Sequence, residues 1–476
     1  MRAGGVVRVP MLIGGEWRHA ARDYAVIDPY RGTTVARAPE SSPENLDAAL
    51  SAAVAAKAKA AATPGYERAA LIERALRLLV ERSEDIARTI SRETGKALKD
   101  ARAEVARSAE TVRLSGEEAV RIQGEHVPLD ATAMGAGKIA MLLRFPVGVV
   151  AGITPFNAPF NLACHKVAPA IAAGNTIVLK PPPQAPLTVH KLVELFVDAG
   201  VPAGVLNVVY GKEVGPLLVR DPRVDFITFT GSTRVGAEIK ATSGLKRVAL
   251  ELGGTGQTVI HSDGSVEAAA PMCARNAMRL AGQSCISVQN IYAHESVYDR
   301  FVAALESEIR KLKVGDPLDP ETDVGTLIDE TAARRVESWI GEAAAAGARV
   351  LTGGTRQGAQ LQPTLMVDVQ PRMKVVCDEV FGPVASVLRY RDLDDMARLI
   401  SENRFGLQCG IFTASVETAL YAARNFRSGG VIINGTSTWR TDQLPYGGVK
   451  DSGIGREGPH YAIREMTEER LVVFNM

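Results

Sequence analysis

Residues 147–180, VGVVAGITPFNAPFNLACHKVAPAIAAGNTIVLK, pass from an apolar strand-like segment through a helical one to a second apolar strand. The same alternation continues to residue 254. Strand-like segments occupy 147–153, 175–180, 204–211, 224–232 and 246–254, and helical segments occupy 165–174, 188–200, 213–221 and 233–244. Because the strands are apolar throughout, the pattern predicts a parallel sheet covered by helices on both faces. The predicted fold class is α/β.

A second stretch of the same kind follows residue 255. Helical segments at 266–282 and 297–313 flank a strand-like segment at 286–295, and GGVIING closes the series at 429–435. Two α/β units in series place a cleft between them, and ligands usually bind in such clefts.

The segments on either side of these units also show clear patterns. Residues 42–121 are rich in Ala, Arg, Glu and Leu, and their apolar residues lie three and four apart, which predicts amphipathic helices. Ser42 and Pro43 suit a helix start, because a capping hydroxyl precedes a residue that needs no N–H there. The tail ERLVVFNM (469–476) predicts a free terminal strand that could pair with an edge in a partner subunit.

The composition excludes several classes of function. The 476 residues include 55 lysines and arginines and 54 acidic residues, a formal net charge of +1. We therefore expect neither a nucleic-acid partner nor a membrane partner, and a small molecule instead. Five cysteines without C-x-x-C spacing argue against disulfides or a metal site and favour a reduced, cytoplasmic setting.

Cys285 and Glu251 are the candidate reactive residues. Cys285 follows Gly-Gln-Ser at the end of an apolar helix, where a ligand could reach the thiol; the alternative is a buried structural cysteine. Glu251 ends an apolar strand directly before two glycines, so its carboxylate should point into a site. Burial there would raise its pKa and suit it to take a proton from water. The alternative for Glu251 is a surface turn.

Two further loops carry weaker indications. Asn157, in PFN after a strand, could donate an amide hydrogen bond to a developing oxyanion, although Asn near Pro is also ordinary turn chemistry. FTGSTRVG (229–236) places Gly231 and Gly236 between a strand and a helix, where the backbone could approach a pyrophosphate. The segment lacks the G-x-G-x-x-G spacing of a dinucleotide-binding fingerprint.

Together these motifs resemble the NAD(P)-dependent aldehyde dehydrogenase superfamily over nearly the whole chain. In order they are PFN (155–157), LK-P (179–181), FTGS (229–232), ELGG (251–254), GQ-x-C (282–285), EVFGP (379–383) and PYGG-x-K-x-SG (445–453). The resemblance implies a Rossmann-like cofactor-binding domain, an α/β catalytic domain and a small β oligomerisation arm, in a homodimer or homotetramer. The implied boundaries are 1–127 and 147–254 for the first, 255–450 for the second, and 128–146 and 451–476 for the arm.

The resemblance also implies a role for each reactive residue. Cys285 would attack the aldehyde, forming a thiohemiacetal and then a thioester, while Asn157 and the Cys285 backbone N–H hold the oxyanion. Glu251 would activate the water that releases a carboxylic acid, which disfavours the CoA-acylating branch of the superfamily. A thiol esterase or hydrolase that uses the same Cys and Glu without a nicotinamide is the alternative.

The implied cofactor is NAD or NADP. Its contacts would be Lys180, Gly211, Gly231, Ser232, Gly236, Leu252, Glu379 and Phe381. Family members that prefer NAD often carry Glu three residues after the lysine, where this chain has Pro183. No carboxylate therefore repels a 2′-phosphate at this position, and NADP is permitted. The alternative is that Pro183 only stiffens the loop and NAD still binds.

The expected substrate is a small polar or anionic aldehyde, such as a semialdehyde, lactaldehyde, or a phosphorylated or phosphono-aldehyde. The resemblance implies substrate contacts at Arg121, His165, Arg279, Ser284 and Arg440. Guanidinium groups over a small pocket favour a carboxylate, phosphate or sulfonate. Ser284, however, stands where relatives with phosphate-bearing substrates carry Arg. For each arginine, a surface or interdomain salt bridge is the alternative.

Overall fold

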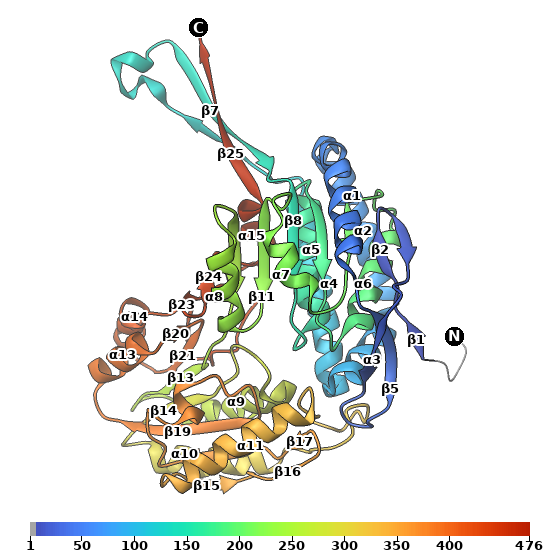
Figure 1. Ribbon diagram of the computed structural model, residues 1–476. Coiled ribbons are helices and arrows are strands. Elements are labelled where there is room, and N and C mark those ends of the chain that lie inside the picture. The colour runs from blue at the N-terminus through green and yellow to red at the C-terminus, as the bar shows by residue number, and fades with distance from the viewer. Residues whose placement is uncertain (1–5) are drawn as a thin grey trace.

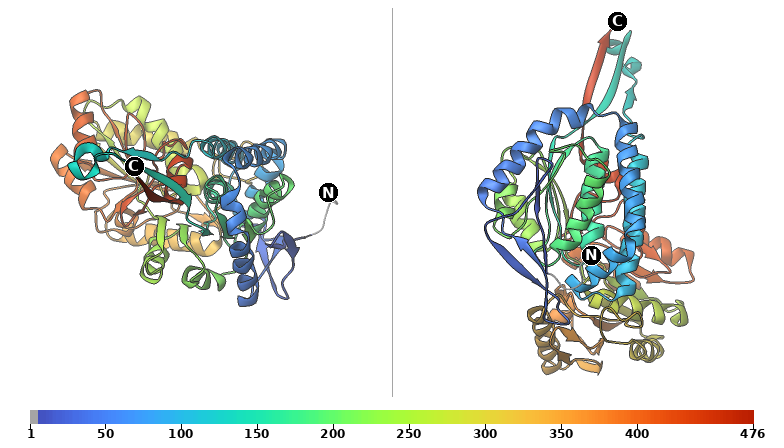
Figure 2. Two further views of the ribbon diagram at one scale, coloured as in Figure 1. Left: turned by 90° about the horizontal axis from the view of Figure 1, so that it is seen from above. Right: turned by 90° about the vertical axis from the view of Figure 1, so that its right-hand side faces the viewer.

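A computed structural model describes residues 6–476. Two sheet-based domains lie one above the other in Figure 1, and a narrow β arm projects from the upper domain with the C-terminus at its tip. The side view in Figure 2 shows helices of the N-terminal half on both sides of the upper sheet. Residues 6–476 contain no helix that combines the length and the apolar character of a membrane span.

The upper sheet has eight strands in the order β24-β12-β11-β8-β9-β10-β2-β3. The central strands run parallel, and the strands at the two edges are antiparallel to their neighbours. The bounds are β2 (Met11–Ile13), β3 (Glu16–Arg18), β8 (Val149–Ile153), β9 (Thr176–Lys180), β10 (Leu206–Val208), β11 (Phe226–Thr230), β12 (Arg247–Glu251) and β24 (Gly453–Ile454). Every residue of β8, β9 and β11 is buried, which confirms the prediction of a sheet covered on both faces.

Helices surround this sheet. Their bounds are α1 (Pro43–Ala62), α2 (Gly65–Glu81), α3 (Ser83–Thr94), α4 (Leu98–Glu118), α5 (Pro159–Ala172), α6 (Pro186–Asp198), α7 (Val214–Arg220) and α8 (Thr233–Thr242). The predicted start of α1 is confirmed: the Ser42 hydroxyl accepts the Asn45 N–H, and Pro43 opens the first turn. All residues of α5 are buried, because α5 lies between the sheet and α4.

The lower domain is built on a seven-stranded sheet in the order β15-β18-β19-β14-β13-β21-β22, parallel except for β15. Its strands are β13 (Gln257–Ile260), β14 (Asn290–His294), β15 (Arg349–Thr352), β18 (Thr364–Val367), β19 (Val384–Tyr390), β21 (Cys409–Phe412) and β22 (Val431–Ile433). Its helices are α9 (Val266–Met278), α10 (Tyr298–Arg310), α11 (Glu330–Ala345), α12 (Lys374–Cys377), α13 (Leu393–Glu402) and α14 (Val416–Asn425).

Smaller sheets complete the body. β1 (Val7–Arg8), β5 (Thr34–Pro39) and β4 (Asp23–Ile27) form one sheet, β16 (Arg356–Gln357) pairs with β17 (Gln360–Leu361), and β20 (Phe405–Gly406) pairs with β23 (Val449–Lys450). The pairing of β20 with β23 holds the closing segment of the chain beside the lower domain.

The arm consists of β6 (Glu125–Val127), β7 (Lys138–Pro146) and β25 (Thr467–Asn475). The tail is a strand, as predicted, but it is not free: β25 pairs antiparallel with β7 of the same chain along its whole length. The C-terminal part of the arm also begins later than expected. β24 pairs with β12 of the upper sheet, and α15 (Pro459–Glu465) packs on α5, so residues 451–466 lie with the upper domain.

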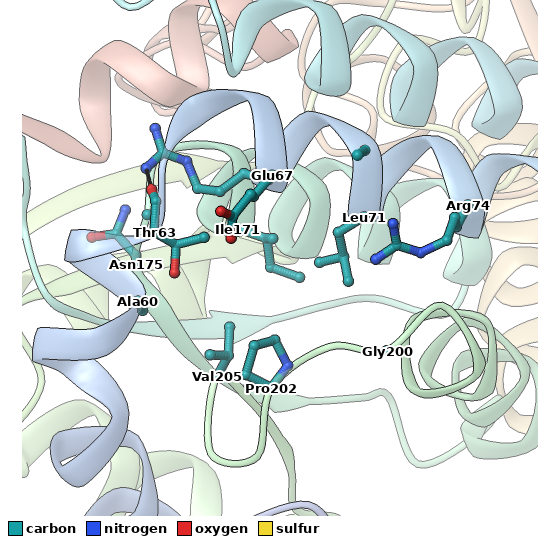
Figure 3. A pocket seen from close by; sticks show the side chains of 13 residues that line it. Ala60, Thr63, Glu67, Leu71, Arg74, Ile171, Asn175, Gly200, Pro202 and Val205 are labelled. Atoms are coloured by element: carbon teal, nitrogen blue, oxygen red, sulfur yellow. Dashed lines mark hydrogen bonds between the residues drawn. The ribbon is translucent and has the colours of Figure 1, made fainter.

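A surface cavity of about 220 Å³ lies between α2, the end of α5 and the start of β10 (Figure 3). Cys285 is not one of the residues that line it. Two arginines of α2 line it. Arg74 donates a 2.8 Å hydrogen bond to the Ala199 carbonyl at the end of α6, and Arg68 donates to the Thr63 carbonyl at the end of α1. Because carbonyls at helix C-termini lack partners within the helix, both arginines have a structural role here.

Candidate active site

A cavity of about 300 Å³ lies between the carboxyl ends of the upper strands and the lower domain. Loops that follow β8, β11 and β12 form one wall, and the chain segments around Cys285 and Glu379 form the other. The predicted site residues that line it are Asn157, Gly231, Ser232, Glu251, Leu252, Cys285, Glu379, Phe381 and Arg440. The cleft that the sequence places between two α/β units is therefore where these residues meet.

Cys285 reaches this cavity because the chain turns sharply after α9. Leu280, Ala281 and Gly282 have φ angles of 56°, 50° and 70°, which lie in the left-handed region. A Cβ at Gly282 would collide with the Gly382 carbonyl, so the turn requires glycine there. Burial raises the pKa of the Cys285 thiol to about 12. The thiol therefore keeps its proton at neutral pH until a base or a positive charge acts on it.

Glu251 is the last residue of β12 and is buried. Desolvation, and secondly the negative charge of Glu457, raise the pKa of the Glu251 carboxyl well above its usual range. Its Oε2 has no hydrogen-bond partner among residues 6–476. A buried carboxyl of this kind can hold or release a proton near neutral pH, and one of its oxygens is free to bind water.

Asn157 follows β8 at the cavity wall. Its side-chain amide forms no hydrogen bond within the described part of the chain, so its N–H groups are available to a ligand. Beside it, the Phe156 ring meets the Phe381 ring edge to face at 5.9 Å. Phe381 adopts a φ of 49°, a conformation that is costly for an aromatic residue and positions the ring in the cavity.

A buried network of charges lies behind the cavity wall. Arg440 pairs with Glu457 at 2.8 Å, and its Nε lies 3.9 Å from Asp442 without a hydrogen-bond acceptor in residues 6–476. Asp442 also pairs with Arg107 at 2.7 Å and lies 3.3 Å from His165. Burial lowers the pKa of His165, so its imidazole is uncharged at neutral pH. Arg440 is the member of this network that supplies a cation to the cavity.

Lys166 extends the same network toward the upper sheet. Its ammonium donates to the Thr230 hydroxyl at 2.7 Å and to Glu457 at 3.1 Å. The neighbouring cations hold the pKa of Glu457 well below its usual range. Glu457 therefore stays ionised, and its charge favours the protonated form of Glu251.

The cofactor side of the cavity combines one carboxylate with a helix start. Glu379 accepts the Gly254 N–H at 3.0 Å through Oε1, and burial raises its pKa to about 7. Ser232 caps α8 by accepting the Val235 N–H. These groups suit ribose hydroxyls and a pyrophosphate respectively, since carboxylates accept from hydroxyls and helix N-termini attract anions.

Lys180 and Gly211 lie outside the cavity, at the ends of β9 and β10. Burial, and secondly the nearby charge of Lys212, lower the pKa of Lys180 to about 8. No carboxylate of the described residues lies within ion-pair distance of either lysine. Gly211 adopts a φ of 98°, in the left-handed region that favours glycine. Gly211 and Lys212 line a further cavity of about 370 Å³, which also contains the carboxyls of Glu40 and Glu93.

Gly236 has a packing role in the structure. It lies within α8, and a Cβ there would collide with the Leu252 side chain. Its lack of a side chain lets the helix approach the strand that carries Glu251. Gly236 itself does not line the cavity.

Several expected substrate contacts do not reach the cavity. Arg121 lies just beyond α4, is 57% exposed, and pairs with Glu117 and Glu118. Arg279 and Ser284 belong to the turn after α9 without lining the cavity. His165 is buried behind Arg440, at 3.4 Å from its guanidinium. Of the five residues, the structure places Arg440 alone in the cavity.

The site also contains residues that the sequence did not single out, among them Lys166 of the charge network. Tyr446 and Arg335 line the cavity together with Glu457, while Arg107 and Asp442 belong to the network behind it. Tyr446 is part of the PYGG motif, and its polar hydroxyl was the signal in the sequence that it could do more than pack against apolar neighbours. Arg335 lies on α11, and Arg107 on α4, among many surface arginines, so no local pattern marks either of them.

Comparisons with known proteins agree with this geometry. The sequence profile of the Aldehyde dehydrogenase family matches residues 17–472. The 3-sulfolactaldehyde dehydrogenase of Priestia megaterium is 42% identical over 468 residues, which are 98% of each chain.

Two solved structures show the same fold. Aldehyde dehydrogenase 21 of Physcomitrella patens, in complex with the reaction product succinate, superposes with a TM-score of 0.97, 37% identity and 99% coverage of both chains. The NADP-dependent glyceraldehyde-3-phosphate dehydrogenase of Bacillus halodurans, complexed with NADP, gives 0.96 at 36% identity, with 98% of this chain and 99% of that chain covered. The chain therefore belongs to the aldehyde dehydrogenase family and is an enzyme that oxidises an aldehyde to a carboxylic acid with NAD or NADP.

Proposed function

We propose that the substrate is a small aldehyde bearing a sulfonate or carboxylate, and that Cys285, Glu251 and Asn157 carry out its oxidation. The observation that carries the proposal is the convergence of these three residues and Arg440 on one cavity of about 300 Å³. A thiol, a carboxyl with a raised pKa, a free amide and a cation supply the nucleophile, the base, the oxyanion donor and the anchor for an anion.

The chemistry begins when the Cys285 thiol gives its proton to a water molecule in the cavity and the sulfur attacks the aldehyde carbon. The carbonyl electrons move to oxygen, and the Asn157 amide and the Cys285 backbone N–H donate hydrogen bonds to that oxyanion. When bound, the nicotinamide supplies the hydride acceptor that turns the thiohemiacetal into a thioester. Glu251 then takes a proton from water, the hydroxide adds to the thioester carbon, and the carbon–sulfur bond breaks to return the thiolate.

The residues around the cavity fit a nicotinamide dinucleotide. Glu379 has one oxygen bound to the Gly254 N–H and the other free for ribose hydroxyls. Arg335 donates to the Val380 carbonyl at 2.7 Å and has no carboxylate within ion-pair distance in residues 6–476, so its charge can face a phosphate or ribose. Lys180 would bind near the other end of the dinucleotide.

Arg440 supports an anionic substrate. Its guanidinium is held against the cavity wall by Glu457 on one side and lies 3.6 Å from the centre of the Tyr446 ring on the other. Because Nη2 pairs with Glu457 and Nε is buried beside Asp442, the fixed guanidinium offers its charge and its Nη1 donors to an oxygen of a carboxylate or sulfonate. Relatives named for sulfolactaldehyde, and one solved with succinate, act on or bind small anions of this size.

Substitution of Arg440 by Lys tests the substrate class. Lysine keeps a positive charge beside Glu457 but cannot pair with Glu457 and donate to the substrate from one planar group, so kcat/KM should fall about 10- to 100-fold for 3-sulfolactaldehyde and succinate semialdehyde. For neutral lactaldehyde the expected fall is less than about threefold. Arg121→Lys is the matched control, because Arg121 lies outside the cavity, and it should change neither value. Equal losses for anionic and neutral aldehydes in Arg440→Lys would contradict an anion anchor.

We also propose that the arm assembles subunits into a homodimer or homotetramer. β7 and β25 project from the body (Figure 1) and expose apolar side chains, among them Leu143, Leu471 and Phe474. Such a patch on a projecting ribbon is typical of an interface. A free catalytic thiol requires reducing conditions, so we place the enzyme in the cytoplasm.

A further inference from the structure

The thiol of Cys285 has a specific neighbour that the mechanism above does not use. The phenol oxygen of Tyr446 lies 3.4 Å from Cys285 Sγ, within hydrogen-bond distance for sulfur. Both residues line the active-site cavity, and Tyr446 is only 5% exposed. The phenol therefore meets the reacting sulfur in a site from which bulk water is largely excluded.

Three features hold Tyr446 in place. Its backbone pairs with that of Glu457 through two hydrogen bonds, of 3.1 and 2.6 Å. The Arg440 guanidinium covers one ring face at 3.6 Å from the centre. Ile286 and Leu407 pack around the ring in a small apolar cluster. A side chain held in this way needs no reorganisation to direct its hydroxyl at the sulfur.

The phenol can act only as a donor to a thiolate, and it keeps its proton to do so. Burial, and secondly the nearby Cys285, raise the pKa of Tyr446 well above its usual range. A hydrogen bond to an ionised acceptor is roughly twice as strong as one between neutral groups. The O–H···S⁻ contact thus stabilises the thiolate more than the O–H···S–H contact stabilises the thiol.

We infer that Tyr446 is a catalytic residue that donates a hydrogen bond to the Cys285 thiolate, both before attack and when the thiolate leaves the thioester. The inference rests on the proposed role of Cys285 as nucleophile. The hydrogen bond from Tyr446 offsets part of the desolvation cost that otherwise disfavours the thiolate in this cavity. In the thioester the sulfur carries no charge, so the bond weakens there and re-forms as the carbon–sulfur bond breaks.

Tyr446→Phe tests the inference, because it removes the hydroxyl and keeps the ring. Alkylation of Cys285 by iodoacetamide is followed against pH, with the modified cysteine identified by peptide mass mapping. At a fixed pH between about 7 and 9, well below the pKa of the thiol, the alkylation rate should be about tenfold lower than in the wild type, because a hydrogen bond to a charged group contributes about one pKa unit or more. kcat should fall while KM for the aldehyde stays unchanged. Unshifted alkylation with unchanged kcat would overturn the inference.

Two further variants make the result specific. Tyr461→Phe makes the same chemical change on α15, where the ring contacts His460 rather than the thiol, and should leave the alkylation profile unchanged. Cys285→Ala separates the inference from the proposed function. Turnover that survives in Cys285→Ala would contradict the nucleophile itself. Loss of turnover there, together with a wild-type alkylation profile in Tyr446→Phe, would refute only the role of the phenol.

Discussion

Replacing Glu379 by Gln should remove a pH dependence from cofactor binding. Burial raises the pKa of the Glu379 carboxyl to about 7. The hydrogen bond from the Gly254 N–H and the charge of Arg335 act in the opposite direction and limit this rise. The ionised carboxylate accepts hydrogen bonds from ribose hydroxyls through the oxygen that the Gly254 N–H leaves free, whereas protonation turns that oxygen into a hydroxyl and removes acceptor capacity. Affinity for the cofactor should therefore rise as the pH increases through about 7.

The magnitude follows from the fraction of ionised Glu379. That fraction is about one half at pH 7 and about one tenth at pH 6, and the apparent Kd scales inversely with it. The Kd should consequently be about tenfold higher at pH 6 than at pH 8, which corresponds to about 1.4 kcal/mol. In Glu379→Gln the side chain keeps its shape and cannot ionise, so binding should be weak and independent of pH between about pH 6 and 7, where Lys180, with a pKa of about 8, stays charged.

Isothermal titration calorimetry with NAD measures this dependence directly. NAD is preferred over NADP for the measurement because a phosphate monoester titrates near pH 6 and would add its own pH dependence. Glu342→Gln is a suitable control, since Glu342 is a carboxylate of α11 outside the cavity, paired with Lys374 on the surface. A wild-type Kd that stays flat between about pH 6 and 8, or a slope that persists in Glu379→Gln, would refute the reasoning.

Three other perturbations probe different parts of the site. Cys285→Ala should abolish dehydrogenase turnover, measured by stopped-flow absorbance, because the thiol is the nucleophile. The Kd for NAD, measured by calorimetry, should change by less than about twofold, because the thiol lies outside the dinucleotide contacts. Residual turnover near the wild-type rate would contradict this. In paired titrations, Lys212→Ala should raise the Kd for NADP by about fivefold or more and the Kd for NAD by less than about twofold. The charge of Lys212 lies near that of Lys180, where a 2′-phosphate could bind. Equal effects on both cofactors would place the 2′-phosphate elsewhere. Asp442→Asn should lower the free energy of unfolding in urea by about 2 kcal/mol, because it removes the carboxylate that faces the buried Arg440 and the half-buried Arg107. A change below about 0.5 kcal/mol would show that the network is not stabilising.

Local sequence was sufficient for much of the catalytic centre. Glu251 is the last residue of an apolar strand, and Asn157 and Cys285 lie a few residues beyond an apolar strand and an apolar helix; the structure brings all three to one cavity. Parallel strands end at the same edge of a sheet, so residues that follow consecutive strands must lie near one another. The strand–helix alternation from 147 to 254 predicted that edge correctly, because periodicity and apolar runs are properties of neighbouring residues.

Packing between distant segments settled what the motifs left open. Arg440 enters the cavity and Arg121 does not, because Glu457 and the Tyr446 ring hold the first, while Glu117 and Glu118 bind the second on the surface. The tail strand pairs with β7 of its own chain because α15 returns the chain to the base of that strand. The residues next to an arginine in the sequence do not show whether its side chain will enter the cavity or pair on the surface. They depend on which buried charge finds its partner after the chain has folded, since an unpaired charge in the interior costs more than any local preference can offset.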